Sequence, residues 1–329
     1  MNRPSRALLL SGVMLAAIGS QACAPATSSE ATQPEDARCR HAFACAEVDG
    51  KVYLFGGLTP EHHEPRPMVA VFDIDTTNWS EAGEDPLPRV MHAGAALNGL
   101  IYVAGGLLDD GSTTGRVLQF DTSTLTWAEV APLSVARNRH AMAVLDGKVY
   151  VSGGMIEEPE TGGVRNTASV ERYDPARNAW ESVAPLPSAR HALALVAYEN
   201  HLYAIGGYGD AEGIGVLVES YDPETDTWRG ERPLQAPRAF FGAAVARGAI
   251  WCIAGRLDRE GTIEVFDPDG GSRLMEPRLG SRNRFGVAAD EDKIVWFGGE
   301  SDTETGLPKY PCLGYRFADD LYIAKGWDD

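Results

Sequence analysis

One sequence pattern recurs six times along this chain and occupies almost all of it. Each copy contains a short apolar run, a tight turn, a second run that ends in Gly-Gly, a variable loop, an aromatic-Asp pair and a Trp. The Gly-Gly pairs stand at Gly56-Gly57, Gly105-Gly106, Gly153-Gly154, Gly206-Gly207 and Gly298-Gly299, with Gly255-Arg256 as a degenerate copy. A repeat of 43 to 53 residues is typical of propellers and stacked arrays, so it predicts a radial or stacked architecture.

Each copy predicts consecutive antiparallel strands. In the third copy, the apolar runs 140–145 and 148–152 flank Asp146-Gly147, which is a strong hairpin signal because both turn residues must tolerate positive φ. A third strand carries the aromatic-Asp pair. A Trp follows six residues after this Asp in four copies, at Trp79, Trp127, Trp180 and Trp228. A large aromatic at a fixed offset indicates an anchor packed between neighbouring sheets.

The order Arg, His or aromatic, Tyr-x-x-Gly-Gly, aromatic-Asp and Trp resembles the kelch repeat. The resemblance covers residues 38–329 and implies an all-β fold: a six-bladed β-propeller of four-stranded antiparallel blades. The expected blades are residues 38–88, 89–134, 135–187, 188–234, 235–279 and 280–329. The repeat weakens in copy five, where Arg273 stands at the Trp offset, and at the end of copy six.

The N-terminal residues 1–22 predict an export signal. Arg3 and Arg6 precede an apolar run over residues 7–18, and Ser20 and Ala22 are the small residues of a cleavage site. Cleavage before Cys23 is typical of bacterial lipoproteins, in which this Cys is acylated and anchors the protein to the envelope. Ordinary secretory cleavage uses the same small residues, so a periplasmic or secreted form stays open. Residues 23–37 are polar and predict a flexible tether.

Closure of the ring is the weakest part of the pattern. Trp327 comes too early to match the other copies, so the sixth blade needs a closing element, which the tether could supply as a strand. A disulfide between Cys39 and Cys312 is a second candidate, because ring closure puts them on adjacent blades and an exported chain can keep a disulfide. Cys45 and Cys252 are predicted to be small buried residues.

Two columns of side chains precede the first strands when these are aligned on an Ala/Gly-x-Ala start. The residues just before the start are His41, His92, His140, His191, Phe241 and Phe285. The residues one position earlier are Arg40, Met91, Arg139, Arg190, Phe240 and Arg284. A further column, two positions before these, consists of Arg38, Arg89, Arg137, Ser188, Arg238 and Arg282. A propeller gathers these strand starts, the Gly-Gly turns and the variable loops at one end, which predicts an anion-binding opening.

The candidate ligand-binding residues are therefore Arg40, His41, His92, Arg139, His140, Arg190, His191 and Arg284. A structural role is the alternative, because an Arg repeated in most blades can bond loop carbonyls or pair with the recurring Asp. Four histidines spread around a ring lie too far apart to share one metal ion, so no metal site and no cofactor are predicted.

Composition limits the function. The chain has 29 basic and 47 acidic residues, a net charge of −18, so broad nucleic-acid binding is excluded by repulsion from the phosphate backbone. No nucleophile motif, phosphate loop or dinucleotide fingerprint is present in the sequence. We expect an exported, monomeric propeller of the cell envelope that binds protein or glycan through its variable loops. A carbohydrate-active enzyme on an anionic sugar, similar to the sialic-acid mutarotases of the kelch family, is the alternative.

Overall fold

The computed structural model describes residues 40–59, 63–158, 160–210, 214–258, 261–275, 282–290, 293–300, 314–318 and 321–325. The expected export signal, the tether, Cys23, Cys39 and Cys312 lie outside these ranges, and so does the proposed disulfide. In the described part of the chain, no helix is long and apolar enough to cross a membrane.

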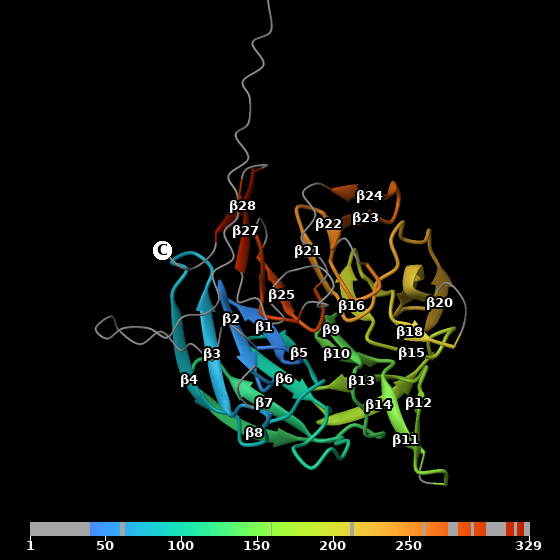
Figure 1. Ribbon diagram of the computed structural model, residues 1–329. Helices are drawn as coiled ribbons and strands as arrows, with labels where there is room; N and C mark the ends of the chain where they lie inside the picture. Colours follow the sequence, from blue (N-terminus) through green and yellow to red (C-terminus); the bar gives the residue numbers. More distant parts are fainter. Residues whose placement is uncertain are drawn as a thin grey trace, which may run out of the picture. The chain divides into compact units, whose positions relative to one another are not determined.

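Four-stranded antiparallel sheets form the framework of the described part of the chain (Figure 1). Five blades are described with their side chains. They are β1 (Ala44–Val48), β2 (Lys51–Phe55), β3 (Met68–Asp73) and β4 (Trp79–Glu84); β5 (Ala93–Leu97), β6 (Leu100–Ala104), β7 (Val117–Asp121) and β8 (Thr126–Val130); β9 (Ala141–Leu145), β10 (Lys148–Ser152), β13 (Val170–Asp174) and β14 (Ala179–Val183); β16 (Ala194–Tyr198), β17 (His201–Ile205), β19 (Val218–Asp222) and β20 (Thr227–Gly230); and β21 (Gly242–Ala246), β22 (Ala249–Ile253), β23 (Ile263–Asp267) and β24 (Gly271–Met275).

A further sheet contains β25 (Gly286–Ala289), β26 (Ile294–Phe297), β27 (Gly314–Ala318) and β28 (Leu321–Lys325). Its outer strands β27 and β28 are described as backbone, and β26 pairs with β27 through Val295–Arg316 and Trp296–Tyr315. The predicted all-β propeller of four-stranded antiparallel blades is confirmed. Its count of six complete blades stays a prediction, because the last sheet borders residues outside the described ranges.

The inner strands and the hairpins after them follow the sequence signals. The predicted turns Asp49-Gly50, Asn98-Gly99, Asp146-Gly147 and Arg247-Gly248 all have positive φ at both residues. They join β1 to β2, β5 to β6, β9 to β10 and β21 to β22, as expected for two-residue hairpins whose twist matches that of the flanking strands.

Hydrophobic cores lie between neighbouring sheets. Phe55 of the first blade packs edge-on against Trp127 of the second, with ring centroids 5.5 Å apart. Indole Nε1 of Trp180 donates to the carbonyl of Ala131 at 2.8 Å, and that of Trp228 donates to Ala184 at the same distance. Each of these bonds links a Trp to the blade before it. The recurring Trp is therefore an anchor between sheets, as predicted.

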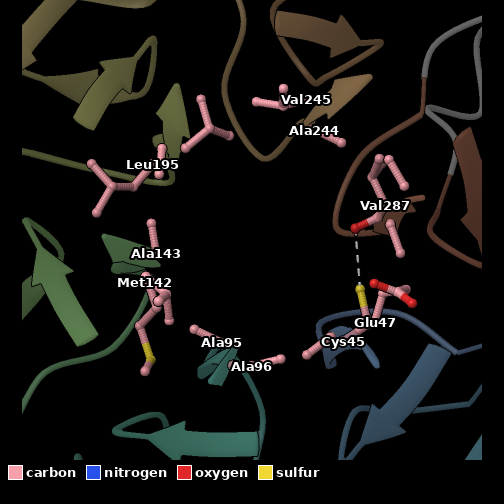
Figure 2. A pocket seen from close by; sticks show the side chains of 17 residues that line it. Cys45, Glu47, Ala95, Ala96, Met142, Ala143, Leu195, Ala244, Val245 and Val287 are labelled. Carbon is pink, nitrogen blue, oxygen red and sulfur yellow. Dashed lines mark hydrogen bonds between the residues drawn. The ribbon is translucent and has the colours of Figure 1, made fainter. Parts of the chain in front are cut away.

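The innermost strands β1, β5, β9, β16, β21 and β25 follow one another around a common centre (Figure 1). They line a cavity of about 310 Å³. Figure 2 shows its wall, in which small apolar side chains such as Ala96, Ala143 and Val245 surround the opening, with Glu47 as the charged exception among the labelled residues. Cys45 Sγ lies 3.5 Å from the carbonyl oxygen of Val287 in this wall, and neither Cys45 nor Cys252 forms a disulfide among the described residues.

Candidate binding site

The segments before the inner strands lie beside the segments after the Gly-Gly turns. Main-chain bridges join His41 to Leu58, Val90 to Leu107, Asn138 to Met155 and Asn283 to Glu300, and β15 (Arg190–His191) pairs with β18 (Tyr208–Gly209). The variable loops therefore begin at one end of the propeller, as predicted. In the third blade this loop contains the hairpin of β11 (Met155–Glu158) and β12 (Gly163–Asn166), and in the fourth it contains the short 3-10 helix η1 (Ile214–Val216).

A cyclic set of main-chain hydrogen bonds runs around this end. The amide of Ala42 donates to Arg284, Met91 to Ala42, Arg139 to Met91, Ala192 to Arg139, Phe240 to Ala192 and Arg284 to Phe240, at 2.8 to 3.0 Å. Each of these six residues has a φ between 50° and 59°. Non-glycine residues rarely adopt this left-handed conformation, so its recurrence shows that the six positions are structurally equivalent. We call these residues the axial ring.

The axial ring corrects the alignment of the Arg and His columns in copies one and four. The inner strands of these copies begin at Ala44 and Ala194, two residues later than aligned, so Arg40 and Arg190 are equivalent to Arg89 and Arg137. The amides of Gly299, Gly57, Gly106, Gly154, Gly207 and Gly255 donate to the carbonyls of Arg40, Arg89, Arg137, Arg190, Arg238 and Arg282, respectively, which confirms this register.

The buried arginines form part of the framework. The side chains of Arg40, Arg89, Arg137, Arg190 and Arg238 are fully buried. Nη1 of Arg137 donates to the carbonyls of Gly153 and Ser169 at 3.0 Å, and Nη2 donates to Glu171 at 2.6 Å. Bonds to loop carbonyls were the predicted structural alternative and are confirmed.

The acidic partners of these arginines differ from the prediction. Arg137, Arg190 and Arg238 pair with Glu171, Glu219 and Glu264, respectively, rather than with the Asp of the aromatic-Asp motif. In the third blade that Asp, Asp174, pairs instead with Lys148 at 2.9 Å.

The four column histidines occupy two different positions. His92 and His140 are buried at the positions of Phe43, Leu193, Phe241 and Phe285, where they pack against the Gly-Gly turns. A Cβ at Gly56 would lie 2.7 Å from Cε1 of His92 and 2.2 Å from the carbonyl oxygen of Arg89, which explains the need for glycine there. Burial lowers the pKa of His140 to about 3, and also lowers that of His92, so both are neutral. His41 is buried on the bridge to Leu58.

Two arginines, Arg139 and Arg284, belong to the axial ring rather than to the buried framework, and His191 precedes Ala192 of that ring. Nη1 of Arg139 donates to Oδ1 of Asn138 at 2.8 Å and lies 3.3 Å from Sδ of Met155. Arg284 pairs with Glu300 at 2.7 Å and lies 5.1 Å above the ring of Phe240. All of these side chains are half-buried except for that of Asn138, which is buried.

His191 belongs to an aromatic group between the fourth and fifth blades. Its ring stacks on Tyr208, with centroids 5.6 Å apart, and lies 6.0 Å from Phe240. Its Nδ1 lies 2.7 Å from Oδ1 of Asn166, so Nδ1 carries the proton and Nε2 is an acceptor in the neutral ring. Burial and the nearby Arg139 charge lower the pKa of His191 to about 4, against a raising contribution from Asp210.

Sequence reasoning missed Tyr208 and Asn166. Both lie in variable loops, and the one available signal is that Tyr208 directly follows a Gly-Gly pair. Among the described residues, no three His, Cys, Asp or Glu side chains gather as a metal-binding group. Two loop segments carry side chains of the kinds that bind metals, residues 61–64 (Glu-His-His-Glu) and residues 109–111 (Asp-Asp-Gly). Glu61 and His62 lie outside the described ranges, and Asp110 accepts hydrogen bonds from the amide and hydroxyl of Ser112 in an exposed turn.

Comparisons with known proteins agree with this fold. Residues 41–255 match the family model of the KLHDC2/KLHL20/DRC7 Kelch-repeats domain. Similar curated proteins include Kelch-like protein 41 of Rattus norvegicus, 49% identical over 172 residues, and Kelch-like protein 40 of Xenopus tropicalis, 32% identical over 179 residues. These matches cover 52% and 54% of this chain, but only 27% and 28% of those proteins.

The chain thus spans about a quarter of the length of these curated relatives. A solved structure titled "Structure of YjhT" matches 89% of this chain and 99% of its own, with a TM-score of 0.69 and 16% identity, which shows a shared fold. With its repeated Gly-Gly turns, buried arginines and inter-blade tryptophans, the chain belongs to the kelch-repeat family.

Proposed function

We propose that this protein is a binding scaffold that engages a partner protein through the loop end of its propeller. The supporting observation is that loops of unequal length and structure start from one end of a regular framework. Residues 153–169 include the β11–β12 hairpin, whereas residues 254–262 of the fifth blade include no such element among those described. Specificity on variable loops above a rigid scaffold is a common use of repeat folds.

A loop exchange tests this proposal. Residues 156–165 are replaced by a short Gly-Ser turn, and the turn 175–178 at the opposite end of the same blade is replaced in a matched control. Proteins cross-linked to the wild-type chain should be lost with the first variant and retained with the second. Equal retention by both variants, both still folded by circular dichroism, would overturn the role of the loop end.

Export and ring closure are part of the same proposal. We propose that residues 1–22 direct export, that Cys23 is acylated, and that the mature chain is a monomer at the cell envelope. A Cys23→Ser change should abolish incorporation of labelled palmitate. Closure of six blades is supported by the 2.7 Å bond from the Gly299 amide to the Arg40 carbonyl and by Trp79 packing 5.3 Å from Phe297.

A carbohydrate-active enzyme acting on an anionic sugar remains the second candidate. The observation that favours it is the neutral imidazole of His191, whose pKa is lowered by burial and by the charge of Arg139. A base beside a cation could accept a proton from an acidic sugar that the cation binds. Millimolar sialic or glucuronic acid should then raise the melting temperature, and NMR should show faster exchange between anomers. A sugar that neither stabilises the protein nor exchanges faster would eliminate this candidate.

A further inference from the structure

An aspartate takes the place of a core leucine in the linker between the first and second blades. The linkers after β8, β14 and β20 each contain a buried leucine whose amide donates to the segment that enters the third strand of the same blade; these leucines are Leu133, Leu186 and Leu234. The amide of Asp85, after β4, makes the equivalent bond to the carbonyl of Pro67 at 2.6 Å, and Asp85 is only 2% exposed. We call residues 85–89 the acidic joint.

The glutamate that pairs with the buried arginine is also replaced in the second blade. In the three blades that follow, the second residue of the third strand is this glutamate, at Glu171 in β13, Glu219 in β19 and Glu264 in β23. In β7 this residue is Leu118, which is buried. Relative to those blades, a leucine and an acid have exchanged places around Arg89, so Asp85 supplies the negative charge that acts on this arginine.

Asp85 does not restore the contacts of the missing glutamate. Nη1 of Arg89 donates to the carbonyls of Gly105 and Arg116 at 3.2 and 3.0 Å, but its Nε and Nη2 are buried without a hydrogen-bond partner among the described residues. Oδ1 of Asp85 accepts from the amide of Leu87 at 2.8 Å, whereas its Oδ2 is buried and has no such partner in the described part of the chain. Buried charges that are incompletely hydrogen-bonded are costly, so this joint is less well satisfied than its equivalents.

Burial disfavours the ionised form of Asp85. It raises the pKa of Asp85 to about 6, and the charge of Arg89 offsets this only in part. The other charged or titratable side chains on the neighbouring segments are Arg66, Glu84, His92, Arg116 and Glu129. Arg116 and Glu129 act on Arg89 with opposite signs, and the charge of Arg89 lowers the pKa of His92. A hydrated aspartate has a pKa of about 3.9, so ionisation favours a form of the joint in which Asp85 reaches water.

The acidic joint also holds the ends of two variable loops. At the first loop, the amide of Gly57 and the carbonyl of Pro67 form main-chain bonds to the joint at 3.0 and 2.6 Å. At the second loop, the guanidinium of Arg89 bonds the carbonyls of Gly105 and Arg116, which lie before and after that loop. Opening of the joint would therefore release both loops from their anchors.

We propose that Asp85 is the displaced counter-charge of Arg89 and that the acidic joint is a pH-sensitive clamp on the first and second variable loops. The joint stays closed when Asp85 is protonated. It opens more often when Asp85 is ionised, because the carboxylate gains hydration in the open form. Partner binding through these loops should then depend on pH, a consequence that rests on the proposed scaffold function.

Amide hydrogen exchange of the full chain tests the clamp. Residues 86 and 88 are prolines, so exchange within the joint reports on the amides of Asp85, Leu87 and Arg89. After correction for the intrinsic exchange rate, the opening equilibrium of the wild type should rise about tenfold more from pH 5 to pH 7 than that of an Asp85→Asn variant. His92 is present in both proteins, so its titration cancels in the comparison.

The amide of Leu133 is a matched control within the same molecule. It makes the equivalent bond, to Gly115 at 2.8 Å, in a linker that also precedes a buried histidine, but there Arg137 pairs directly with Glu171. Exchange at Leu133 should show no such rise. The double exchange Asp85→Leu/Leu118→Glu restores the arrangement of the later blades, so it should abolish the rise at the joint.

Equal pH dependence in the wild type and Asp85→Asn would overturn the clamp, because it would show that hydration already satisfies the carboxylate. The comparison of Asp85 with Leu133 in the wild type needs no variant, and an equal rise at both amides would overturn the clamp as well. If a partner depends on the loop end but the joint does not respond to pH, the scaffold function stands and the clamp is wrong. If the joint responds but no partner is captured, the clamp stands and the scaffold function is wrong.

Discussion

The main-chain amide of Ala42 donates a 2.8 Å hydrogen bond to the carbonyl oxygen of Arg284, joining the segment before the first inner strand to the segment before the last. Four further bonds of the axial ring link consecutive blades, and a fifth, from Arg284 to Phe240, completes the circle. Each donor residue has a left-handed backbone that other contacts must stabilise, because such a conformation costs about 1–2 kcal/mol for an L-residue.

Replacing an axial-ring alanine by glycine should therefore be harmless. Ala192→Gly should leave the free energy of unfolding unchanged or raise it by up to about 1 kcal/mol, since glycine adopts positive φ without strain. Ala194→Gly, two residues later in β16, should lower it by about 1 kcal/mol. Urea unfolding of both variants measures the difference, and equal losses would contradict the assignment of the ring.

Replacing a buried arginine should lower the free energy of unfolding more than replacing a partly exposed one. Arg190→Met leaves the carboxylate of Glu219 buried without its 2.5 Å partner, which should cost about 3–5 kcal/mol. Arg172→Met removes a partly exposed ion pair with Glu181 of the same blade and should cost at most about 1 kcal/mol. Denaturant midpoints with unchanged m-values test the ranking, and a similar loss in both variants would contradict the framework role.

Acid should destabilise the fold through the buried histidines. The pKa of His140 is about 3 in the folded chain, below the ordinary value near 6.5, because of burial and the Arg137 charge. As the pH falls, the unfolded chain therefore takes up this proton before the folded chain does. The contribution of His140 to the free energy of unfolding is complete above about pH 6.5 and is lost as the pH falls toward 3.

A His140→Phe variant isolates this effect. Phe stands at the equivalent positions 241 and 285, so the change should be accommodated. Between pH 6 and 4, the wild type should lose about 1.4 kcal/mol per pH unit more than the variant for this one group. Identical slopes for the wild type and His140→Phe would refute the argument.

Burial lowers the pKa of His191 most, and the charges of Arg139 and Asp210 should shift this pKa in opposite directions. Arg139→Gln should raise the pKa of His191 above about 4, because one of the two effects that depress it is removed while burial remains. Asp210→Asn should lower this pKa further, because Asp210 favours the charged imidazole. Histidine side-chain NMR shifts followed against pH measure both, and no movement in either variant would place His191 outside the reach of Arg139.

The sequence by itself determined the repeat, the hairpin turns and the role of the tryptophans, because these depend on residues a few positions apart. Asp146-Gly147 specifies its own turn, and Trp180 repeats at a fixed distance from Asp174. The family follows from the same local pattern.

Only the tertiary structure decided which arginines belong to the axial ring and which are buried in the framework. Ala42-Phe43-Ala44 and Ala192-Leu193-Ala194 contain two alanines that could each begin the inner strand, and the sequence does not distinguish them. The choice depends on hydrogen bonds between blades that are distant in the sequence. These bonds set Ala42 and Ala192 in the axial ring, bury Arg40 and Arg190, and leave Arg139 and Arg284 as the two arginines of the ring.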